Sequence, residues 1–522
     1  MTNYDYVELP KPKVSGFDLS YSNKLTMDMG DLVPVYKQEV LPGDEFKVNS
    51  QFMVRMAPLS NPIYTKLNAT IHYFFVPNRL LWDKTSTSGW ENFITGGKDG
   101  TLAPVPPYLP LSQIIKHGYA DDADGKGAQT LADYMGIPYV PDTGVEHSYD
   151  KFSINAFPFL AYNKIYDDWF RDPNVTNSLC ENYGSHWLQG GDLSNDGSLQ
   201  WYSSTKELLK LKKRCWSKDY FTSALPWAQR GPEAVIPVGQ TFKSMIPGGN
   251  VTNDISLITS EDGAKYGLNP LSLGTIRDLR NASSLQLWLE KNAVGGARYI
   301  EQLLAHFGVY SDDARLQRAE YLGSVKSPIV ISEVQSNAET AEAPLGKLGG
   351  KGISYGNDFA FNEKFKEHGW IIGIMSILPD ASYCQGLHRS LTHRMEKLDY
   401  AFPEFCEIGL QEINNSEIYI DDQNLSISDD IFGYGDRYGE YKSNYNEVHG
   451  LFKNPEETLS QYNMTRFFGE TPELSKQFLE VNEKDITSPF VDTAENRGNF
   501  WVDIWNDVKA VRPLTKNSIP LF

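Results

Sequence analysis

The chain has 522 residues, of which 40% are hydrophobic and 22% charged, and its formal net charge is −19. This length suits roughly two to four domains and allows a large buried core. The acidic balance excludes a uniformly basic nucleic-acid-binding surface, because such binding depends mainly on neutralised phosphates. No apolar run of about 18 residues occurs, so no membrane span is expected.

Four cysteines are widely separated and form no CxxC pair: Cys180, Cys215, Cys384 and Cys406. This spacing argues against a zinc cluster and against a disulfide scaffold. The first 13 residues, MTNYDYVELPKPK, contain no apolar segment of signal-peptide length. We therefore expect synthesis in a reducing cytoplasm, with no bound metal and no cofactor.

Residues 1–43 are interpreted as an N-terminal arm. Residues 1–16 are polar and contain proline, and Met29 to Tyr36 is an extended, apolar-studded segment, since Pro34 forbids a helix interior there. The arm lacks a core of its own, so Met29 to Tyr36 is expected to pack against neighbouring structure.

Residues 44–56 alternate polar and apolar side chains after the turn at Pro42-Gly43-Asp44. A period of two is typical of a half-buried β-strand. Residues 67–76 follow as a second strand, where Tyr73-Phe74-Phe75-Val76 is rich in strand-forming aromatic residues. Together the two segments predict the first strands of a β-sandwich.

Helices and strands alternate with loop-rich segments in the rest of the chain. Apolar periodicity predicts helices near 112–117, 129–135 and 155–170, and a helical insertion over 275–307 that is broken at Gly295-Gly296. Short β-branched runs predict strands at 328–334 and 370–378, and residues 499–511, NFWVDIWNDVKAV, end the part of the chain that is expected to be ordered. We interpret 44–522 as a single sandwich domain with large insertions; a multidomain enzyme is the alternative on composition alone.

Enzymatic motifs are missing from the sequence, which contains no HExxH, no G-x-S-x-G and no phosphate-binding loop of the type G-x-x-x-x-G-K-[ST]. Gly346 to Gly352 has the wrong spacing for such a loop and is interpreted as a flexible loop. The acidic run Asp121 to Gly125 lacks the ligand register of a calcium loop. His388 and His393 are five residues apart, so we expect them to make hydrogen bonds beside Arg389 and Arg394 rather than to bind metal. Carboxylates are numerous, so the sequence does not exclude the pair of catalytic carboxylates of a glycosidase, although no particular pair can be singled out.

Two basic segments contrast with the acidic composition. The first lies between 206 and 218, and the second interleaves aromatic residues with cations near the C-terminus, as single-strand binders do. For each, the alternative is an ordinary solvated face or a packed terminus. The candidate nucleic-acid-binding residues are Lys206, Lys210, Lys212, Lys213 and Arg214, with Lys218 nearby, and Trp505, Lys509, Arg512 and Lys516.

Several long segments resemble the major capsid proteins of small single-stranded DNA phages, the Microviridae, and within them the gokushovirus branch. They occur in the family's order from about residue 17 to residue 514. They are FDLSYSNKLTMDMGDLVPVYKQEVLPGDEFKVNSQFMVRMAPL, HYFFVPNRLLWDK, WENFITGG, DYFTSALPWAQRGP, GGARYIEQLLAHFGVYSDDARLQRAEYLG and VDIWNDVKAVRPL.

The resemblance implies a mainly β fold, an eight-stranded viral jelly roll with large helical and loop insertions, and no catalysis. It implies a T=1 icosahedral shell of 60 copies around circular single-stranded DNA, made in the bacterial cytoplasm and located in the virion. Implied partners are a small basic viral protein, a minor pilot protein, a scaffolding protein and a host surface receptor. The segment 238–271 is our candidate for a surface protrusion at the threefold axes.

Two competing interpretations remain at this point. One is a carbohydrate-binding or carbohydrate-active jelly roll that stacks sugars on exposed Trp and Tyr. The other is a capsid subunit of a different viral lineage.

Overall fold

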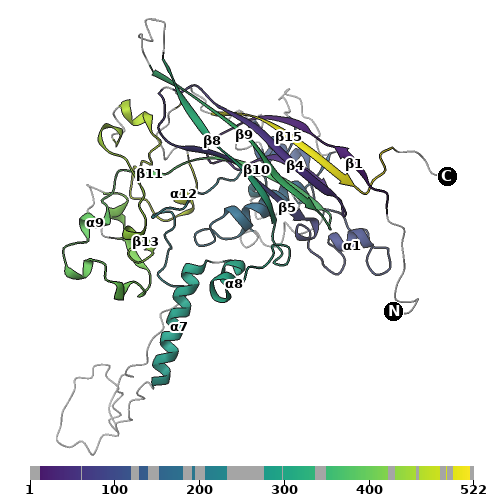
Figure 1. Cartoon of the computed structure of the whole chain (residues 1–522). Coiled ribbons are helices and arrows are strands. Elements are labelled where there is room, and N and C mark those ends of the chain that lie inside the picture. Colours follow the sequence, from purple (N-terminus) through teal and green to yellow (C-terminus); the bar gives the residue numbers. More distant parts are fainter. Residues whose placement is uncertain are drawn as a thin grey trace, which may run out of the picture.

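The computed structural model describes residues 12–59, 61–118, 128–138, 152–179, 191–193, 206–231, 276–296, 298–335, 348–420, 430–453, 458–482, 490 and 498–517. One large curled antiparallel sheet dominates it (Figure 1). The strands of this sheet are β1 (Ser15–Asp18), β2 (Tyr21–Met27), β3 (Val33–Val40), β4 (Glu45–Met56), β5 (Leu67–Pro77), β8 (Glu320–Gln335), β9 (Leu348–Lys364), β10 (Gly369–Pro379) and β15 (Phe500–Arg512).

Small two-stranded sheets and short helices occupy the connections between the long strands. The paired short strands are β6 (Tyr108–Pro110) with β7 (Ser153–Asn155), β11 (Ser382–Tyr383) with β14 (Asn446–Glu447), and β12 (Gln411–Asn414) with β13 (Ile431–Gly435). The helices are α1 (Trp90–Thr95), α2 (Leu111–Gly118), α3 (Leu131–Tyr134), α4 (Phe157–Ile165), α7 (Ile276–Gly295), α8 (Tyr299–Phe307), α9 (Arg389–Thr392), α11 (Gly439–Lys442) and α12 (Lys476–Leu479).

The strand order is β1-β15-β4-β9-β8-β5-β10-β3, and β2 pairs with β15. The long strand β8 pairs with β9 along one part and with β5 along another, so the sheet folds over itself there. The two halves enclose the main core, which holds side chains from β4, β5, β10 and β15. The prediction of a mainly β jelly-roll sandwich with insertions is confirmed.

Within the described residues, the half formed by β15, β4 and β9 is covered on its inner face only. In β4, every second side chain from Phe46 to Met56 is buried, while the residues between them are exposed or half-buried. The same alternation runs through β15 from Phe500 to Ala510. A period of two therefore marks strands with one face on the core and one face in solvent.

The other half is covered on both faces. In β5 and β10 nearly all side chains are buried, which matches the almost continuous apolar runs of their sequences. Phe74 and Ile372 point away from the main core and join a second core with side chains of α1 to α4 and the segments around them. In the part of the chain that the structure describes, the helices thus cover one outer face of the sandwich and leave the other bare.

The N-terminal segment contributes the strands β1, β2 and β3 to the sheet. The expectation that Met29 to Tyr36 packs against neighbouring structure is confirmed, because this segment is largely buried. Val33–Val40 is β3, the edge strand beside β10, and Val33, Val35 and Tyr36 are buried. The register with β10 shifts next to Pro34. An edge strand tolerates proline because the missing N–H removes no internal ladder bond. Residues 1–11 lie outside the described part of the chain.

The glycine-rich segment expected to be a loop at Gly346 to Gly352 leads instead into β9, which begins at Leu348. Two glycines of β9 serve close packing. A Cβ at Gly356 would lie 2.6 Å from the ring of Phe52, and one at Gly352 would collide with Met56 Sδ. Glycine in a strand interior often marks such a close approach, so composition alone was misleading here.

The helical insertion appears where periodicity predicted it, as α7 and α8. Helix α8 ends at Gly308, which has a left-handed backbone conformation typical of a helix C-terminus. Helix α7 extends away from the sandwich (Figure 1). The proposed protrusion at 238–271 and the acidic run at 121–125 lie outside the described residues, and the domain bounds 1–43 and 44–522 stay predictions.

Candidate nucleic-acid interface

The basic segment at 206–218 is largely built into the body of the chain. Residues 206–209 form a helical turn, and the following extended segment makes bridges with Asp31 and Glu480. The Lys212 side chain is only 3% exposed, and its Nζ lies 3.0 Å from Glu207 Oε2. Lys213 Nζ lies 2.6 Å from Asp31 Oδ1. These cations therefore neutralise carboxylates of their own chain.

Arg214 and Lys218 are also engaged internally. Arg214 Nη1 donates a 2.6 Å hydrogen bond to Ser376 Oγ in β10, and its guanidinium lies near the ring of Phe170. Lys218 Nζ pairs with Asp172 at 2.7 Å. Burial and internal partners argue against Lys212 and Arg214 as phosphate ligands. Lys206 and Lys210 are exposed and stay candidates.

Lys212 offers a test through pH. Burial is the main cause that lowers its pKa from 10.5 to about 8, although Glu207 acts in the opposite direction. The unfolded chain then holds this proton more tightly than the folded chain, so this group makes stability rise with pH between about 8 and 10.5. In the Lys212→Met variant, this contribution to the rise in stability between about pH 8 and pH 10.5 should be absent.

Urea unfolding at about pH 7 and about pH 10 measures the effect as the difference between wild type and Lys212→Met. We expect the wild type to gain stability relative to the variant at the higher pH. Lys210→Met is the matched control, because Lys210 is half exposed. If the free energy of unfolding changes with pH in the same way in Lys212→Met and in Lys210→Met, Lys212 is not buried as described.

The second segment lies on β15 and divides between the two faces of this strand. Trp505 is 47% exposed and lies with Lys509 on the bare outer face. Lys509 Nζ pairs with Asp18 at 2.6 Å and with Asp507 at 3.3 Å. Arg512 instead donates from Nε to the fully buried Asp44, at 3.0 Å.

The structure therefore brings Trp505 and Lys509 together, holds Arg512 in a buried ion pair, and leaves Lys516 exposed beyond the end of β15. Sequence reasoning missed the partners that β4 and β9 add to the same face, above all Arg55 and Tyr355. The alternation along each strand marks their side as exposed, but strand pairing is needed to place Arg55 opposite Trp501 and Tyr355 opposite Met53, on the face that Trp505 shares.

The part of the chain that the structure describes contains no group of three or more His, Cys, Asp or Glu side chains that could hold a metal ion. It also contains no helix that is both long and apolar enough to cross a membrane. Cys215, Cys384 and Cys406 are free thiols, and Cys180 lies outside the described residues.

Comparison with known proteins connects this geometry to a family. The family model described as "Capsid protein (F protein)" matches residues 10–522. The chain belongs to this family. It is 32% identical to capsid protein VP1 of Bdellovibrio phage phiMH2K, over 97% of this chain and 95% of the relative. It is 30% identical to capsid protein VP1 of Chlamydia phage 1, over 99% and 97%, and 26% identical to that of Spiroplasma virus 4, over 98% and 95%.

These matches confirm the resemblance to Microviridae capsid proteins of the gokushovirus-like branch. The capsid protein is a structural protein, and its relatives are named as capsid proteins rather than as enzymes. Its functional surfaces are therefore contact surfaces. Lys212, Lys213, Arg214 and Lys218 bind partners within the subunit. The remaining candidates for the nucleic-acid interface are the exposed Lys206 and Lys210 and the outer face of β15.

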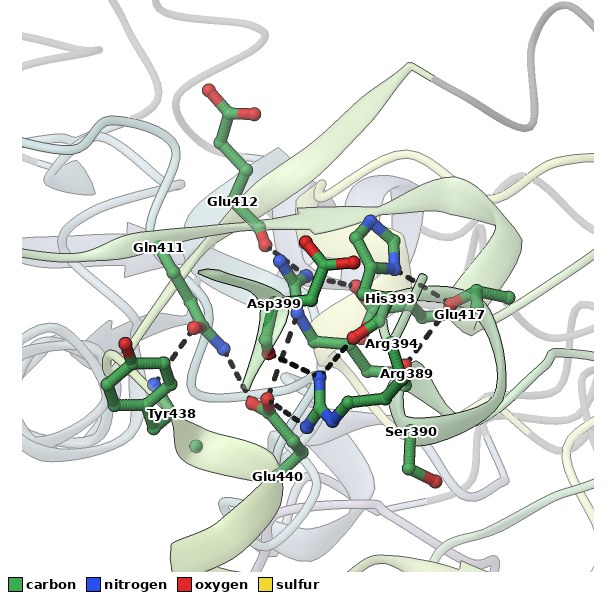
Figure 2. A network of polar contacts seen from close by, with 12 residues as sticks. Arg389, Ser390, His393, Arg394, Asp399, Gln411, Glu412, Glu417, Tyr438 and Glu440 are labelled. Atoms are coloured by element: carbon green, nitrogen blue, oxygen red, sulfur yellow. Dashed lines mark hydrogen bonds and ion pairs between the residues drawn. The ribbon is translucent and has the colours of Figure 1, made fainter. Parts of the chain in front are cut away.

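The capsid protein also holds a network of charged side chains in its 382–450 insertion (Figure 2). Arg389 Nη1 lies 2.7 Å from Glu417 Oε1, and Arg394 Nη2 lies 3.0 Å from Glu440 Oε1. Burial acts to raise the pKa of Glu440, but hydrogen bonds from Gln411 and Arg394 outweigh it and lower the pKa. The arginines of this cluster thus join segments of one chain rather than bind an external anion.

Proposed function

We propose that this chain is the subunit of a T=1 icosahedral shell, in which 60 copies enclose a circular single-stranded DNA genome. Membership of the capsid protein family over nearly the whole chain carries the proposal. Surface loops, including the segment 238–271, would serve host attachment. A small basic viral protein would supply packaging charge to this acidic chain, and scaffolding and pilot proteins would assist assembly.

Exposed apolar side chains on two separate parts of the subunit support self-assembly. On the insertion around α9, Leu391, Met395 and Leu398 are 67%, 82% and 65% exposed. On α8, Tyr299 and Phe307 are 69% and 75% exposed. Groups of exposed apolar side chains are typical of protein–protein contact surfaces. Figure 1 shows that the two regions lie apart, as a closed shell with several contacts per subunit requires.

The test is expression of the chain together with the other proteins of its genome, followed by size-exclusion chromatography, mass measurement and negative-stain imaging. We expect closed particles of one diameter with a protein mass near 60 chains of 58.9 kDa. DNA extracted from them should be degraded by a nuclease specific for single strands.

A double variant tests the contact surface. Met395→Glu with Leu398→Glu places charge into the proposed contact and should reduce particle yield at least about tenfold, since an unpaired buried charge costs several kcal/mol. Thermal unfolding of the unassembled chain should be unchanged. Lys397→Gln, in the same turn, is the matched control. If the double variant gives a normal particle yield, this surface is not a contact between subunits.

A further inference from the structure

The bare outer face of β15, β4 and β9 carries exposed aromatic rings. Trp501 and Trp505 on β15 are 48% and 47% exposed, and Tyr355 and Phe359 on β9 are 64% and 51% exposed. These four rings belong to two strands that flank β4. Rings of this size are usually buried, so their repeated exposure on one face indicates a binding surface.

Cations interleave with these rings. In the strand register Arg55 stands between Trp501 and Ile353, and Lys47 stands directly opposite Lys509. Like charges directly opposite each other destabilise a sheet; here Asp18 and Asp507 compensate Lys509. Among the described residues, Lys47 and Arg55 form no ion pair, and neither does Lys24 of the neighbouring strand β2.

Several carboxylates share the face. Besides Asp507 and Asp503 on β15, they are Asp18 on β1, which pairs with Lys509 Nζ at 2.6 Å, and the exposed Glu45 on β4, which stands opposite Lys364. Asp507 lies 3.3 Å from Lys509 Nζ and accepts a 3.4 Å hydrogen bond from Asn49. Asp503 stands opposite Lys24 in the register between β2 and β15. The face therefore keeps unpaired cations, although the whole chain has a net charge of −19.

A groove lies at one end of this face. Its volume is about 930 Å³, and its lining includes Trp501, Arg55, Lys24, Tyr21 and Tyr134. This volume lies within the range of small-ligand sites, which is several hundred to about 1,000 Å³. The aromatic and cationic face thus continues into a concave site of a size that accepts a nucleotide.

We propose that the outer face of β15, β4 and β9 is a stacking platform for single-stranded DNA. Bases stack on Trp501, Trp505, Tyr355 and Phe359, while Arg55, Lys47 and Lys24 lie beside the phosphates. Stacking is tolerant of sequence because every base has an aromatic face. This inference rests on the proposed function and assigns the genome contact to a particular face of the subunit.

The test measures binding of a fluorescent deoxythymidine oligonucleotide of about 30 residues to the purified full-length chain by anisotropy. Trp501→Ala with Trp505→Ala should weaken binding about tenfold or more for each ring removed. Trp501→Phe with Trp505→Phe should retain most of the affinity, because phenyl rings still stack. Trp288→Ala on α7 is the matched control, as Trp288 is 52% exposed and lies away from this face.

A second pair of variants tests the phosphate contacts. Lys47→Gln with Arg55→Gln should reduce the slope of log affinity against log salt by about 0.7 per cation. Lys291→Gln on α7 is the control, since Lys291 is exposed. Dextran sulfate, a polyanion without bases, should bind equally to wild type and to the tryptophan variants.

Two outcomes would contradict the stacking platform. The first is an unchanged oligonucleotide affinity in the double alanine variant. The second is that this variant loses affinity for dextran sulfate and for DNA to the same extent. Loss of particles with unchanged oligonucleotide binding would assign the face to subunit contact. If particles form normally and only the predicted loss of DNA binding fails, this inference is wrong while the proposed function stands. If the wild-type chain forms no closed particles, the proposed function itself is wrong, whatever the oligonucleotide measurements give.

Discussion

Replacing Glu417 by alanine is expected to lower the free energy of unfolding by about 3–5 kcal/mol, the usual cost of breaking a buried ion pair. The side chain of Glu417 is 1% exposed. It accepts hydrogen bonds from Arg389 Nη1 at 2.7 Å and from Tyr220 Oη at 2.9 Å. The alanine variant leaves both donors in a low-dielectric setting without their acceptor. Urea unfolding of the unassembled chain measures the loss.

Glu412→Ala is the control for this prediction. Glu412 lies on the neighbouring strand β12, and Figure 2 shows its carboxylate pointing away from the network. Only the main-chain oxygen of Glu412 takes part, as acceptor for Arg389. We expect Glu412→Ala to change stability by less than about 0.5 kcal/mol. Similar losses for both variants would mean that the network is not what stabilises the insertion.

Phe74→Ala is expected to lower the free energy of unfolding by about 3–5 kcal/mol, as is typical of large-to-small core substitutions. Phe74 points outward from β5 and is 1% exposed. Its ring centroid lies 5.5 Å from that of Trp169, 5.8 Å from that of Phe170 and 5.6 Å from that of Tyr321. The substitution therefore opens a cavity where the covering helices meet the sheet.

Phe359→Ala is the matched substitution on the bare face. Phe359 is 51% exposed on β9, so its removal opens no cavity, and we expect a loss below about 1 kcal/mol. The comparison of the two variants tests the difference between the two outer faces of the sandwich. Equal losses would mean that the outer face of β9 is covered as well. Thermal or urea unfolding is sufficient for the measurement.

Particular segments show which features could be predicted from local pattern. The alternation from Phe46 to Met56 predicted β4, and the unbroken apolar run at 370–378 predicted a strand inside β10. Apolar spacing placed α7 and α8. Each of these signals depends on residues close together in the chain, so it is visible without the fold.

The failures involve residues whose environment is set by distant partners. Gly352 belongs to a segment whose composition is typical of a loop, but the close approach of Met56 requires glycine at this position within β9. Pro34 excluded a helix and indicated an extended segment that packs against neighbouring structure, but only the fold shows that this segment is the edge strand beside β10. Lys212 looked like a surface cation, but Glu207 and the surrounding core hold it inside.

By itself, the sequence determined the strand and helix periodicities and, through long ordered segments, the capsid family. It also indicated that Trp505 and Lys509 belong to one segment in which aromatic residues and cations alternate. Only the tertiary structure decided that these two residues share one exposed face of the sheet with Arg55, Tyr355 and Phe359. The reason is physical: strand register joins residues that are hundreds of positions apart, and burial of a cation depends on carboxylates that arrive from other segments.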